Sequence, residues 1–215
     1  MSQAKFLRAR SPEHKQERRD AILSAARDLA TASGVRNVTL GAIADAVGLA
    51  KSNVVRYFGT REEIYLALTA ECWREWAAEV LRRLAAGDGV VDALAETLAA
   101  RTLLCDLLSQ MQINLEHNVA VPAASDFKRT ALDALTELGK AVAAADPTLT
   151  DDESFELVGA AMAFAGTFYP ASKPSPTMAE VYAQHPELAF ACLPFLPTLK
   201  RILRILLAGL HATRD

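Results

Sequence analysis

Hydrophobic residues recur every three or four positions along most of the chain, which is the spacing of one face of an α-helix. Between residues 17 and 32 this stripe consists of Ala21, Ile22, Ala25, Ala26, Leu29 and Ala32. Gly34 follows directly, where the left-handed residue that ends a helix is expected. Residues 1–14 show no such periodicity. The pattern therefore predicts a mobile arm and then a first helix.

Two short helices are predicted next, on either side of Gly48. Thr39 is a suitable N-cap for the first of them, whose apolar face consists of Leu40, Ile43, Ala44 and Val47. Leu49 is apolar and would fill the turn, and the second short helix runs from about residue 50 to residue 58. Two short helices joined by a tight glycine-containing turn form a helix-turn-helix. Both need the first helix as a packing partner, because neither is long enough to be stable alone.

A long fourth helix is predicted over 61–84. Thr60 and Glu63 have the spacing of a capping box, and the apolar residues that follow are four apart: Ile64, Leu68, Cys72 and Trp76. The glycine-containing segment 85–89 ends this helix.

The remainder of the chain also shows helical periodicity, so the predicted fold class is all-α. Helices are expected over 90–101, 103–117, 125–145, 151–169 and 193–212, with a second capping box at Thr150 to Glu153. Breaks are expected at Pro122, at Pro147 and at Pro170. After Pro170 we expect a surface loop with one short helix following Thr177. The domains are then 1–60, with a flexible basic N-terminal arm, and a helical domain 61–215.

Charge is distributed unevenly between these two domains. Through Arg61 there are eleven basic and five acidic residues, a net charge of +6. The remainder has 12 basic and 21 acidic residues, a net charge of −9. A basic N-terminal domain on an acidic body is typical of a protein that binds a polyanion at one end. Chance clustering on solvated helix faces is the alternative.

The predicted third helix has the composition of a DNA-recognition helix, the element that enters the major groove. Val54 and Phe58 are four apart and are expected to face the core. The outward side chains can pair with base edges and are Lys51, Ser52, Asn53 and Arg56. The hydroxyls of Tyr57 and Thr39, together with Arg61, are expected at phosphates. An exposed polar helix of a generic bundle is the alternative.

Several other classes of protein are disfavoured by the sequence. No apolar run is long enough to span a bilayer, and the polar, basic N-terminus lacks the apolar region of a secretory signal, so we expect a cytoplasmic protein without membrane contact. Cys72, Cys105 and Cys192 form no CxxC pair, and we interpret them as small apolar core residues. His14, His185 and His211 have no acidic or Cys neighbours at ligand spacing, so no metal and no cofactor are expected. An enzyme is the remote alternative, because no HExxH, GxSxG or phosphate-binding glycine loop occurs.

Several features occur together, in order, in the first sixty-odd residues: an alanine-rich first helix, Gly34, Thr39, the segment IADAVG, and Tyr57-Phe58 ahead of the capped fourth helix. Together they resemble the N-terminal domain of tetracycline-repressor-type (TetR-type) transcriptional regulators. The resemblance covers under a third of the chain. It implies a sequence-specific regulator, usually a repressor, with a helical C-terminal domain that dimerises and often encloses a small-molecule pocket.

The third helix departs from that family's pattern at two places. Such proteins often have Gly followed by Thr or Ser where Ser52 and Asn53 stand, and Tyr where Val55 stands. Val55 cannot donate a hydrogen bond to a phosphate. We expect it to contact a thymine methyl group instead.

The last helix supports dimerisation independently, because it is apolar around much of its circumference. Pairing it and the 151–169 helix with their copies in a second chain would form a four-helix interface. The expected interface residues are Phe155, Val158, Met162, Leu199, Leu203, Leu206 and Leu210. A homodimer would present two recognition helices to a palindromic operator in double-stranded DNA. The alternative is that both helices lie in the core of a monomer.

A ligand pocket needs an apolar lining and a few polar groups. The candidate lining residues are Trp73, Trp76, Met111, Asn114, His117, Phe127, Met162, Phe164, Phe168 and Tyr169. Asn114 and His117 are three apart on one predicted helix face and are the candidate pair that orients a small apolar or amphipathic effector. Two alternatives remain open. These residues are ordinary core and His117 faces solvent, or the protein is a DNA-binding regulator without an effector.

Overall fold

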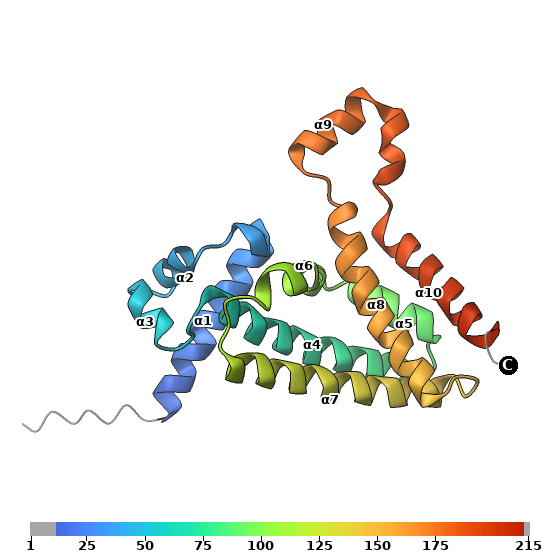
Figure 1. Ribbon diagram of the computed structural model, residues 1–215, viewed down its shortest axis with the longest axis horizontal. Helices are drawn as coiled ribbons and strands as arrows, with labels where there is room; N and C mark the ends of the chain where they lie inside the picture. The colour runs from blue at the N-terminus through green and yellow to red at the C-terminus, as the bar shows by residue number, and fades with distance from the viewer. Residues whose placement is uncertain (1–11, 213–215) are drawn as a thin grey trace, which may run out of the picture.

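The computed structural model describes residues 12–212, and every regular element in that range is a helix, as the predicted all-α fold requires (Figure 1). The N-terminal elements are α1 (Pro12–Ser33), the 3-10 turn η1 (Val35–Asn37), α2 (Leu40–Ala46) and α3 (Lys51–Val55). The larger part consists of α4 (Arg61–Ala85), α5 (Val90–Ala99), α6 (Thr102–Gln110), η2 (Met111–Leu115), α7 (Val121–Ala145), α8 (Asp151–Ala171), α9 (Pro176–Gln184), η3 (Pro186–Ala191) and α10 (Phe195–Ala212).

The N-terminal helices contribute to one hydrophobic core. Ile22 of α1, Ile43 of α2 and Val54 of α3 are fully buried in it, and Phe58 just after α3 is 3% exposed. Since α2 and α3 have only seven and five residues, their stability comes from this burial rather than from their own hydrogen bonds. The first helix is therefore the packing partner that the sequence predicts for them.

The first helix begins earlier than its periodicity indicates. It starts at Pro12 rather than Glu17, and proline is favoured in a first helical turn because an N–H there has no partner within the helix. Residues 1–11 of the predicted arm lie outside the described residues, whereas 12–14 belong to α1. The core-facing stripe is also rotated, since it consists of Ile22, Leu23, Ala26 and Ala30 and leaves Ala21 and Ala32 exposed.

The fourth helix is the central element of the molecule. Twelve of its 25 residues are buried, and it packs against α1, α5, α6 and α7. Figure 1 shows α4 and α7 side by side, with α8 crossing them and α10 beside α8. The Thr60 hydroxyl oxygen accepts a hydrogen bond from the Glu63 N–H (3.1 Å). This cap starts the helix where the sequence predicts, and its end differs from the predicted one by a single residue.

Several helix boundaries in the body differ from those predicted, and three of the differences have a clear local cause. The helix expected over 103–117 is α-helical only to Gln110 and continues as a π-helical turn, η2. Pro122 lies in the first turn of α7, so α7 begins at Val121 rather than at residue 125. Pro170 lies inside α8 rather than ending it. So close to the C-terminus of a helix, proline removes one hydrogen bond and leaves little helix to disrupt.

Two of the three cysteines are buried. Burial raises the pKa of the Cys72 thiol to about 11 and that of the Cys105 thiol to about 12, so both remain protonated and apolar, as predicted. Cys192 is partly exposed. Within residues 12–212, no helix has the length and hydropathy needed to cross a bilayer, and no three His, Cys, Asp or Glu side chains gather as a metal site.

A polar pair is buried between α4 and α5. The indole N–H of Trp76 donates to the Thr97 hydroxyl oxygen (2.8 Å), and that hydroxyl donates to the Ala93 carbonyl (2.6 Å). Trp76 is 0% exposed and Thr97 3% exposed. Thr97 is therefore the acceptor on which a deeply buried N–H depends.

Thr97→Val is expected to lower the free energy of unfolding by about 1–3 kcal/mol, because the buried Trp76 N–H loses its acceptor. Thr136 of α7 is the matched control, since its exposed hydroxyl also donates to a helix carbonyl, that of Leu132. Thr136→Val is expected to change stability by less than about 0.5 kcal/mol. Urea denaturation of both variants measures the difference, and equal losses at the two positions would contradict the role assigned to Thr97.

Candidate DNA-binding interface and ligand pocket

The turn between α2 and α3 fixes the direction of α3. Gly48 has a φ of +63°, a left-handed conformation that glycine adopts without strain. The N–H of Leu49 donates to the Ala44 carbonyl (2.9 Å), which ties the turn back to α2. The predicted tight turn is thus present at the predicted glycine, and it separates two helices as in a helix-turn-helix.

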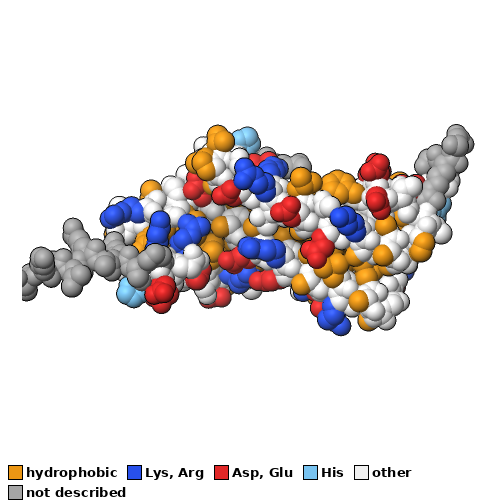
Figure 2. All heavy atoms as spheres, turned by 90° about the horizontal axis from the view of Figure 1, so that it is seen from below, with side chains coloured by type: hydrophobic (Ala, Val, Ile, Leu, Met, Phe, Trp, Pro, Cys, Tyr) orange, Lys and Arg blue, Asp and Glu red, His pale blue; other side chains and the backbone are white. Residues whose placement is uncertain are grey.

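One side of α3 is buried and the other is exposed. Val54 and Phe58 face the core, and the exposed side chains are Lys51, Ser52, Asn53, Val55 and Arg56. Tyr57 is half-buried. α3 stands at the end of the molecule remote from α10 (Figure 1), and Figure 2 shows Lys and Arg side chains at that end, with acidic side chains among them and over the rest of that face. The outward set expected from the sequence is therefore displayed together on an accessible helix.

Thr39 has a structural role beside any contact with phosphate. Its hydroxyl oxygen accepts from the Ala42 N–H (3.1 Å) and caps α2. Accepting that bond leaves the hydroxyl proton available to a phosphate oxygen. The side chain is exposed, so both roles are compatible.

Arg19 of α1 supports the end of α3, which the sequence pattern did not indicate. Its guanidinium donates to the Tyr57 carbonyl (2.6 Å) and lies 4.0 Å from the centroid of the Phe58 ring. The cation thus satisfies a carbonyl just beyond α3 and covers the core aromatic residue. In the sequence, Arg19 lies four positions before Leu23 and is one of several neighbouring charged residues, so nothing there distinguished it.

Arg61 is placed differently from the expectation that it reaches the DNA backbone. Its Nε–H donates to the Val38 carbonyl (2.6 Å), a second N–H donates to the Val35 carbonyl, and the guanidinium lies 4.8 Å from the Tyr65 ring centroid. Together with a hydrogen bond to the Glu62 carboxylate (3.1 Å), these contacts engage three of the five guanidinium N–H donors. In this structure Arg61 therefore joins α4 to η1, and its contact with DNA stays a prediction.

An open, mostly apolar groove of about 540 Å³ lies between α6, α7 and α8. Its lining residues are Trp73, Leu108, Ser109, Met111, Leu135, Gly159, Met162, Ala163, Gly166, Thr167 and Pro170. Ser109 and Thr167 supply the polar groups of this lining, and it includes no charged side chain. A few hydroxyls in an apolar groove suit an apolar or weakly polar molecule.

Three of the predicted pocket residues line this groove, namely Trp73, Met111 and Met162. The Trp73 indole N–H points at the Met162 sulfur (2.9 Å) and its ring stacks on Phe127 at 5.8 Å. Phe127 is therefore one layer behind the groove. Other predicted members lie elsewhere: Trp76 is bonded to Thr97, Phe164 and Phe168 stack on each other (5.6 Å), and Tyr169 contacts Phe195 (5.6 Å).

The predicted orienting pair does not line the apolar groove. Asn114 and His117 are exposed and border a separate, polar hollow of about 380 Å³ together with Arg36 and Gln110. The amide of Asn114 donates to the Gln110 side chain (2.7 Å). The displacement arises because η2 replaces the last turns of the predicted helix, which changes the direction of the side chains beyond Gln110.

The groove is wide because α8 carries small residues on the side facing it. Gly159, Ala163 and Gly166 recur at spacings of four and three. The sequence prediction of the pocket was based mainly on aromatic and methionine residues, so it missed these small ones. A Cβ at Gly166 would lie 3.1 Å from the carbonyl carbon of Leu108. Glycine there allows α6 and α8 to approach closely at one end of the groove.

The predicted dimer residues divide between two environments. Val158, Met162, Leu199 and Leu203 are at most 6% exposed and pack inside the chain, so they are not available to a second copy. This corrects their assignment and matches the alternative of a core role. Leu206 and Leu210 are half-buried, and Phe155 is 38% exposed. The exposed sides of α8 and α10 carry other residues, including Ala163, Arg201, Ile205 and Ala208.

A helix-turn-helix domain on a helical body with an apolar groove defines the chain as a two-domain DNA-binding transcriptional regulator. Family comparison agrees over nearly the whole chain. Residues 22–68 match the family of bacterial regulatory proteins called tetR, and residues 70–214 match the tetracyclin repressor-like C-terminal domain. The chain therefore belongs to the TetR family of transcriptional regulators. No curated protein is significantly similar to it in sequence.

Solved structures share this fold at low sequence identity. A possible TetR family regulator from Streptomyces coelicolor A3(2) superposes with a TM-score of 0.60 at 19% identity, over 91% of this chain and 100% of its own. Thermus thermophilus FadR, a TetR family repressor in complex with lauroyl-CoA, has a TM-score of 0.56 at 21% identity, over 92% of this chain and 96% of its own. RolR in complex with resorcinol has a TM-score of 0.51 at 16% identity, over 75% of this chain and 88% of its own. At these identities the similarity establishes the fold.

Lys51→Ala and Arg56→Ala are each expected to weaken DNA binding, because both side chains are exposed on α3. A lost base contact should relax specificity at one position by about 1–3 kcal/mol, whereas a lost phosphate contact should weaken all sequences similarly and reduce the salt dependence. Fluorescence anisotropy at several salt concentrations separates these cases. Arg129→Ala, an exposed arginine of α7, is the control. Unchanged affinity in both α3 variants would show that α3 is not the recognition helix.

Leu135→Glu is expected to weaken binding of an apolar fluorescent probe, anilinonaphthalene sulfonate, by about ten-fold or more, because a carboxylate in the apolar lining must be desolvated. Leu132→Glu is the matched control, since Leu132 lies on the same helix, is 56% exposed and is outside the groove. Fluorescence titration gives both affinities. Similar losses in the two variants would indicate that the probe binds outside the groove.

Proposed function

We propose that this protein is a repressor that binds a palindromic operator as a homodimer and is released from it by a small apolar or amphipathic ligand. The carrying observation is that one helix, α4, contacts the DNA-binding domain at one end and contributes Trp73 to the apolar groove further along. Such a helix connects the two sites mechanically. We expect the protein to act in the cytoplasm, where bacterial operators are found.

Operator binding is supported by the exposed side of α3. Lys51 and Arg56 offer cations, and Asn53 offers the amide that pairs with adenine. Val55, 42% exposed, is placed to contact a thymine methyl group. Ser52 and Tyr57 supply hydroxyls for the phosphate backbone of the DNA, as does Thr39 at the start of α2.

A homodimer is supported by the exposed sides of α8 and α10. Phe155 and Ile205, which are 38% and 54% exposed, would lose solvent contact on association. Glu156 of α8 and Arg201 of α10 are exposed beside them and provide opposite charges for a self-complementary surface. Two recognition helices related by a two-fold axis read half-sites about 34–36 Å apart, or a multiple of that distance.

Ligand release is supported by the composition of the groove and by its neighbours. The lauroyl-CoA bound to Thermus FadR carries a long apolar chain, and the resorcinol bound to RolR is a small aromatic molecule. The lauroyl chain and the resorcinol ring each suit a lining made of leucine, methionine, tryptophan and small residues. A ligand can act only through different affinities for two arrangements of the protein.

A route from groove to DNA-binding domain passes through α6. Leu108 and Ser109 of α6 line the groove, and Asp106 on the same helix accepts a hydrogen bond from the Val35 N–H (2.7 Å). The Val35 carbonyl in turn accepts from Arg61 of α4. Any displacement of α6 by a ligand would therefore act on η1, which directly precedes the recognition motif.

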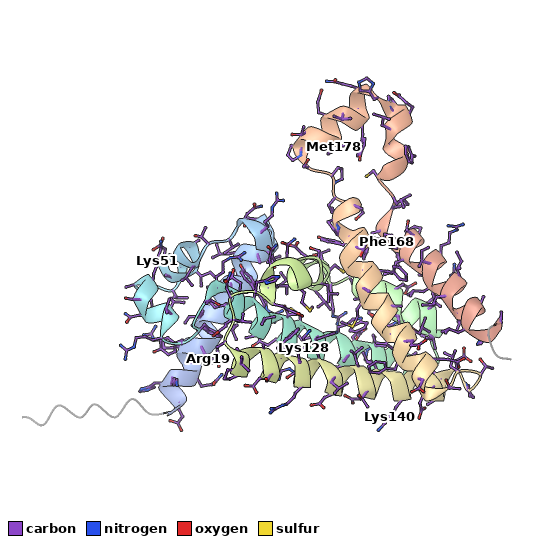
Figure 3. The ribbon with its side chains drawn as sticks, viewed as in Figure 1. Arg19, Lys51, Lys128, Lys140, Phe168 and Met178 are labelled. Atoms are coloured by element: carbon purple, nitrogen blue, oxygen red, sulfur yellow. The ribbon has the colours of Figure 1, made fainter. Side chains whose placement is uncertain are left out.

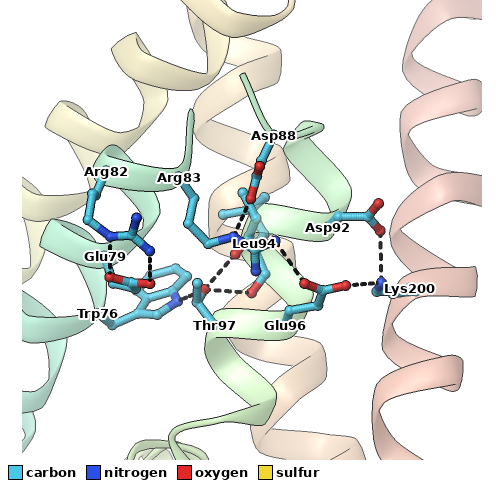
Figure 4. A network of polar contacts seen from close by, with 11 residues as sticks. Trp76, Glu79, Arg82, Arg83, Asp88, Asp92, Leu94, Glu96, Thr97 and Lys200 are labelled. Carbon is cyan, nitrogen blue, oxygen red and sulfur yellow. Dashed lines mark hydrogen bonds and ion pairs between the residues drawn. The ribbon is translucent and has the colours of Figure 1, made fainter. Parts of the chain in front are cut away.

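A charged network joins α4 to α10 at the other end of the molecule (Figure 4). The Arg83 guanidinium lies 2.8 Å from a Glu96 carboxylate oxygen, and the Lys200 ammonium lies 3.0 Å from an Asp92 oxygen. Lys200 also bonds Glu96, and this bond, followed by that from Arg83, lowers the pKa of the Glu96 carboxyl. The network links α4, α5 and the proposed dimer helix α10.

Selection of bound sequences from a random duplex pool tests DNA binding, palindromy and half-site spacing together. We expect two inverted half-sites at the spacing given above. Enriched sequences without inverted symmetry, or a lack of any enrichment, would reject the proposal that a homodimer binds a palindromic operator.

The selected operator then allows a test of ligand release with lauroyl-CoA as the probe. Saturating lauroyl-CoA is expected to weaken operator binding by about ten-fold or more, equivalent to about 1.4 kcal/mol. Leu135→Glu should remove that response while it preserves operator affinity. Equal affinity with and without the probe would reject lauroyl-CoA as an effector and favour a regulator that does not respond to acyl chains.

A further inference from the structure

The polar hollow of about 380 Å³ lies where the N-terminal helices meet the body and is here called the η1–η2 hollow. Three parts of the chain border it: η1, the first turn of α4, and η2 with the residues that follow it. Its polar lining includes Arg36, Arg61, Gln110, Asn114, His117 and Asn118. The volume is at the lower end of the range for small-molecule sites, which is about 300–1,000 Å³.

The η1–η2 hollow is separate from both of the sites described above. It shares no lining residue with the apolar groove, although Gln110 borders the hollow and its neighbours Ser109 and Met111 border the groove. Among the side chains expected at DNA, Arg61 alone lines the hollow. Figure 3 shows Lys51 at the far end of the N-terminal helices from α6. The hollow therefore has binding groups of its own.

Two arginines give the hollow a positive charge. Arg61 is fixed by hydrogen bonds to two backbone carbonyls and to the Glu62 carboxylate, and its side chain is 20% exposed. Glu62 supplies the one carboxylate among the described lining residues, and it lies 3.1 Å from Arg61, so its charge is already compensated. Arg36 is exposed and has no hydrogen bond or ion pair from its guanidinium within residues 12–212. One cation of the hollow is therefore left without a counter-charge.

The other polar side chains of the hollow add neutral donors. Asn114 donates one amide hydrogen to Gln110 and keeps the second. His117 and Asn118 are exposed, and their side chains have no hydrogen-bond partner in the described part of the chain. Together with the two guanidinium groups, these side chains offer more N–H donors than free acceptors. Such a lining suits an oxyanion, either a carboxylate or a phosphate.

We propose that the η1–η2 hollow is a second ligand site, which binds a small organic oxyanion through a carboxylate or phosphate group bonded to Arg36 and Arg61. The amides of Asn114 and Asn118 and the ring of His117 bond its remaining polar atoms. This site goes beyond the proposed function, because it depends neither on the apolar groove nor on a dimer or an operator.

The position of the hollow gives a bound anion a structural effect. It joins Arg36 in η1 to His117 and Asn118, which follow η2. η1 directly precedes α2, and η2 is a π-helical turn, an element often found at functional sites. An anion that binds only while these parts face each other stabilises that arrangement. The hollow thus responds to a charged molecule, chemically unlike the apolar ligand expected in the groove.

Isothermal titration calorimetry of the full-length protein with citrate and with glycerol 3-phosphate tests the site. Citrate supplies carboxylates and glycerol 3-phosphate supplies a phosphate, so the tighter probe identifies the preferred group. Glycerol at the same ionic strength is the neutral control. We expect saturable binding of at least one anion in the millimolar range or below, and none of glycerol.

Two substitutions remove binding groups and leave the fold intact. Arg36→Gln is expected to weaken anion binding by about ten-fold or more, because it removes a charge-assisted hydrogen bond. Asn118→Gly is expected to weaken it by about three-fold or more, as loss of a neutral hydrogen bond does. Asn118 has a φ of +60°, which glycine adopts without strain, so the turn is preserved.

Two further variants are the controls. Arg56→Gln removes an exposed cation from α3, and Leu135→Glu changes the apolar groove. Each is expected to alter anion affinity by less than about two-fold, because charges remote from the hollow are screened by salt.

The outcomes separate this inference from the proposed function. Failure of both anions to bind, or wild-type affinity in Arg36→Gln or Asn118→Gly, overturns the second site. So does an equal loss in Arg36→Gln and Arg56→Gln, which would show a general attraction of anions to the basic N-terminal helices. A chain that is monomeric or binds no operator overturns the proposed function, whereas Arg36-dependent anion binding in that chain still establishes the site.

Discussion

The burial of α4 between the two parts of the chain is the contact on which the rest of the structure depends. Its first half packs against α1, where Arg27 bridges to Glu71 and Glu75 at 3.3 and 2.8 Å, and its length packs against α5, α6 and α7. Because α2 and α3 are too short to hold themselves in place, the orientation of α3 follows from α1 and α4. The position of the exposed side of α3 therefore depends on how α4 packs in the C-terminal helical domain.

Local signals explain which features the sequence predicts well. The Thr60 cap and the four-residue spacing after it need no tertiary information, and they locate α4 to within a residue. Val54 and Phe58 likewise orient α3 through their spacing alone. Arg61 shows the limit of such reasoning, because its backbone acceptors, the carbonyls of Val38 and Val35, are 23 and 26 positions away in sequence. The buried dimer candidates Leu199 and Leu203 fail for the same reason, since an apolar stripe does not reveal which chain covers it.

The small residues of α8 determine both the volume of the groove and how closely α8 packs against α6. Gly159 and Ala163 leave space, whereas Gly166 brings α8 against the backbone of Leu108 in α6. A ligand larger than this space must displace side chains or move α6, since close-packed interiors do not compress. The π-helical turn η2 at the end of α6 is the kind of irregular element that accommodates such movement at functional sites.

The two ends of α4 are held by different kinds of contact. At its C-terminal end, Arg83 is joined through Glu96 to Lys200 on α10, so α4 and the proposed dimer helix are linked by several charges at once. At the N-terminal end, Arg61 of α4 donates to the carbonyls of Val35 and Val38, and Asp106 of α6 accepts a hydrogen bond from the Val35 N–H. Exposed ion pairs contribute little singly, but a network with shared partners holds geometry better than an isolated pair. In the proposed homodimer, movement of α6 is therefore expected to act on η1 through Asp106 and to change the separation of the two α3 helices.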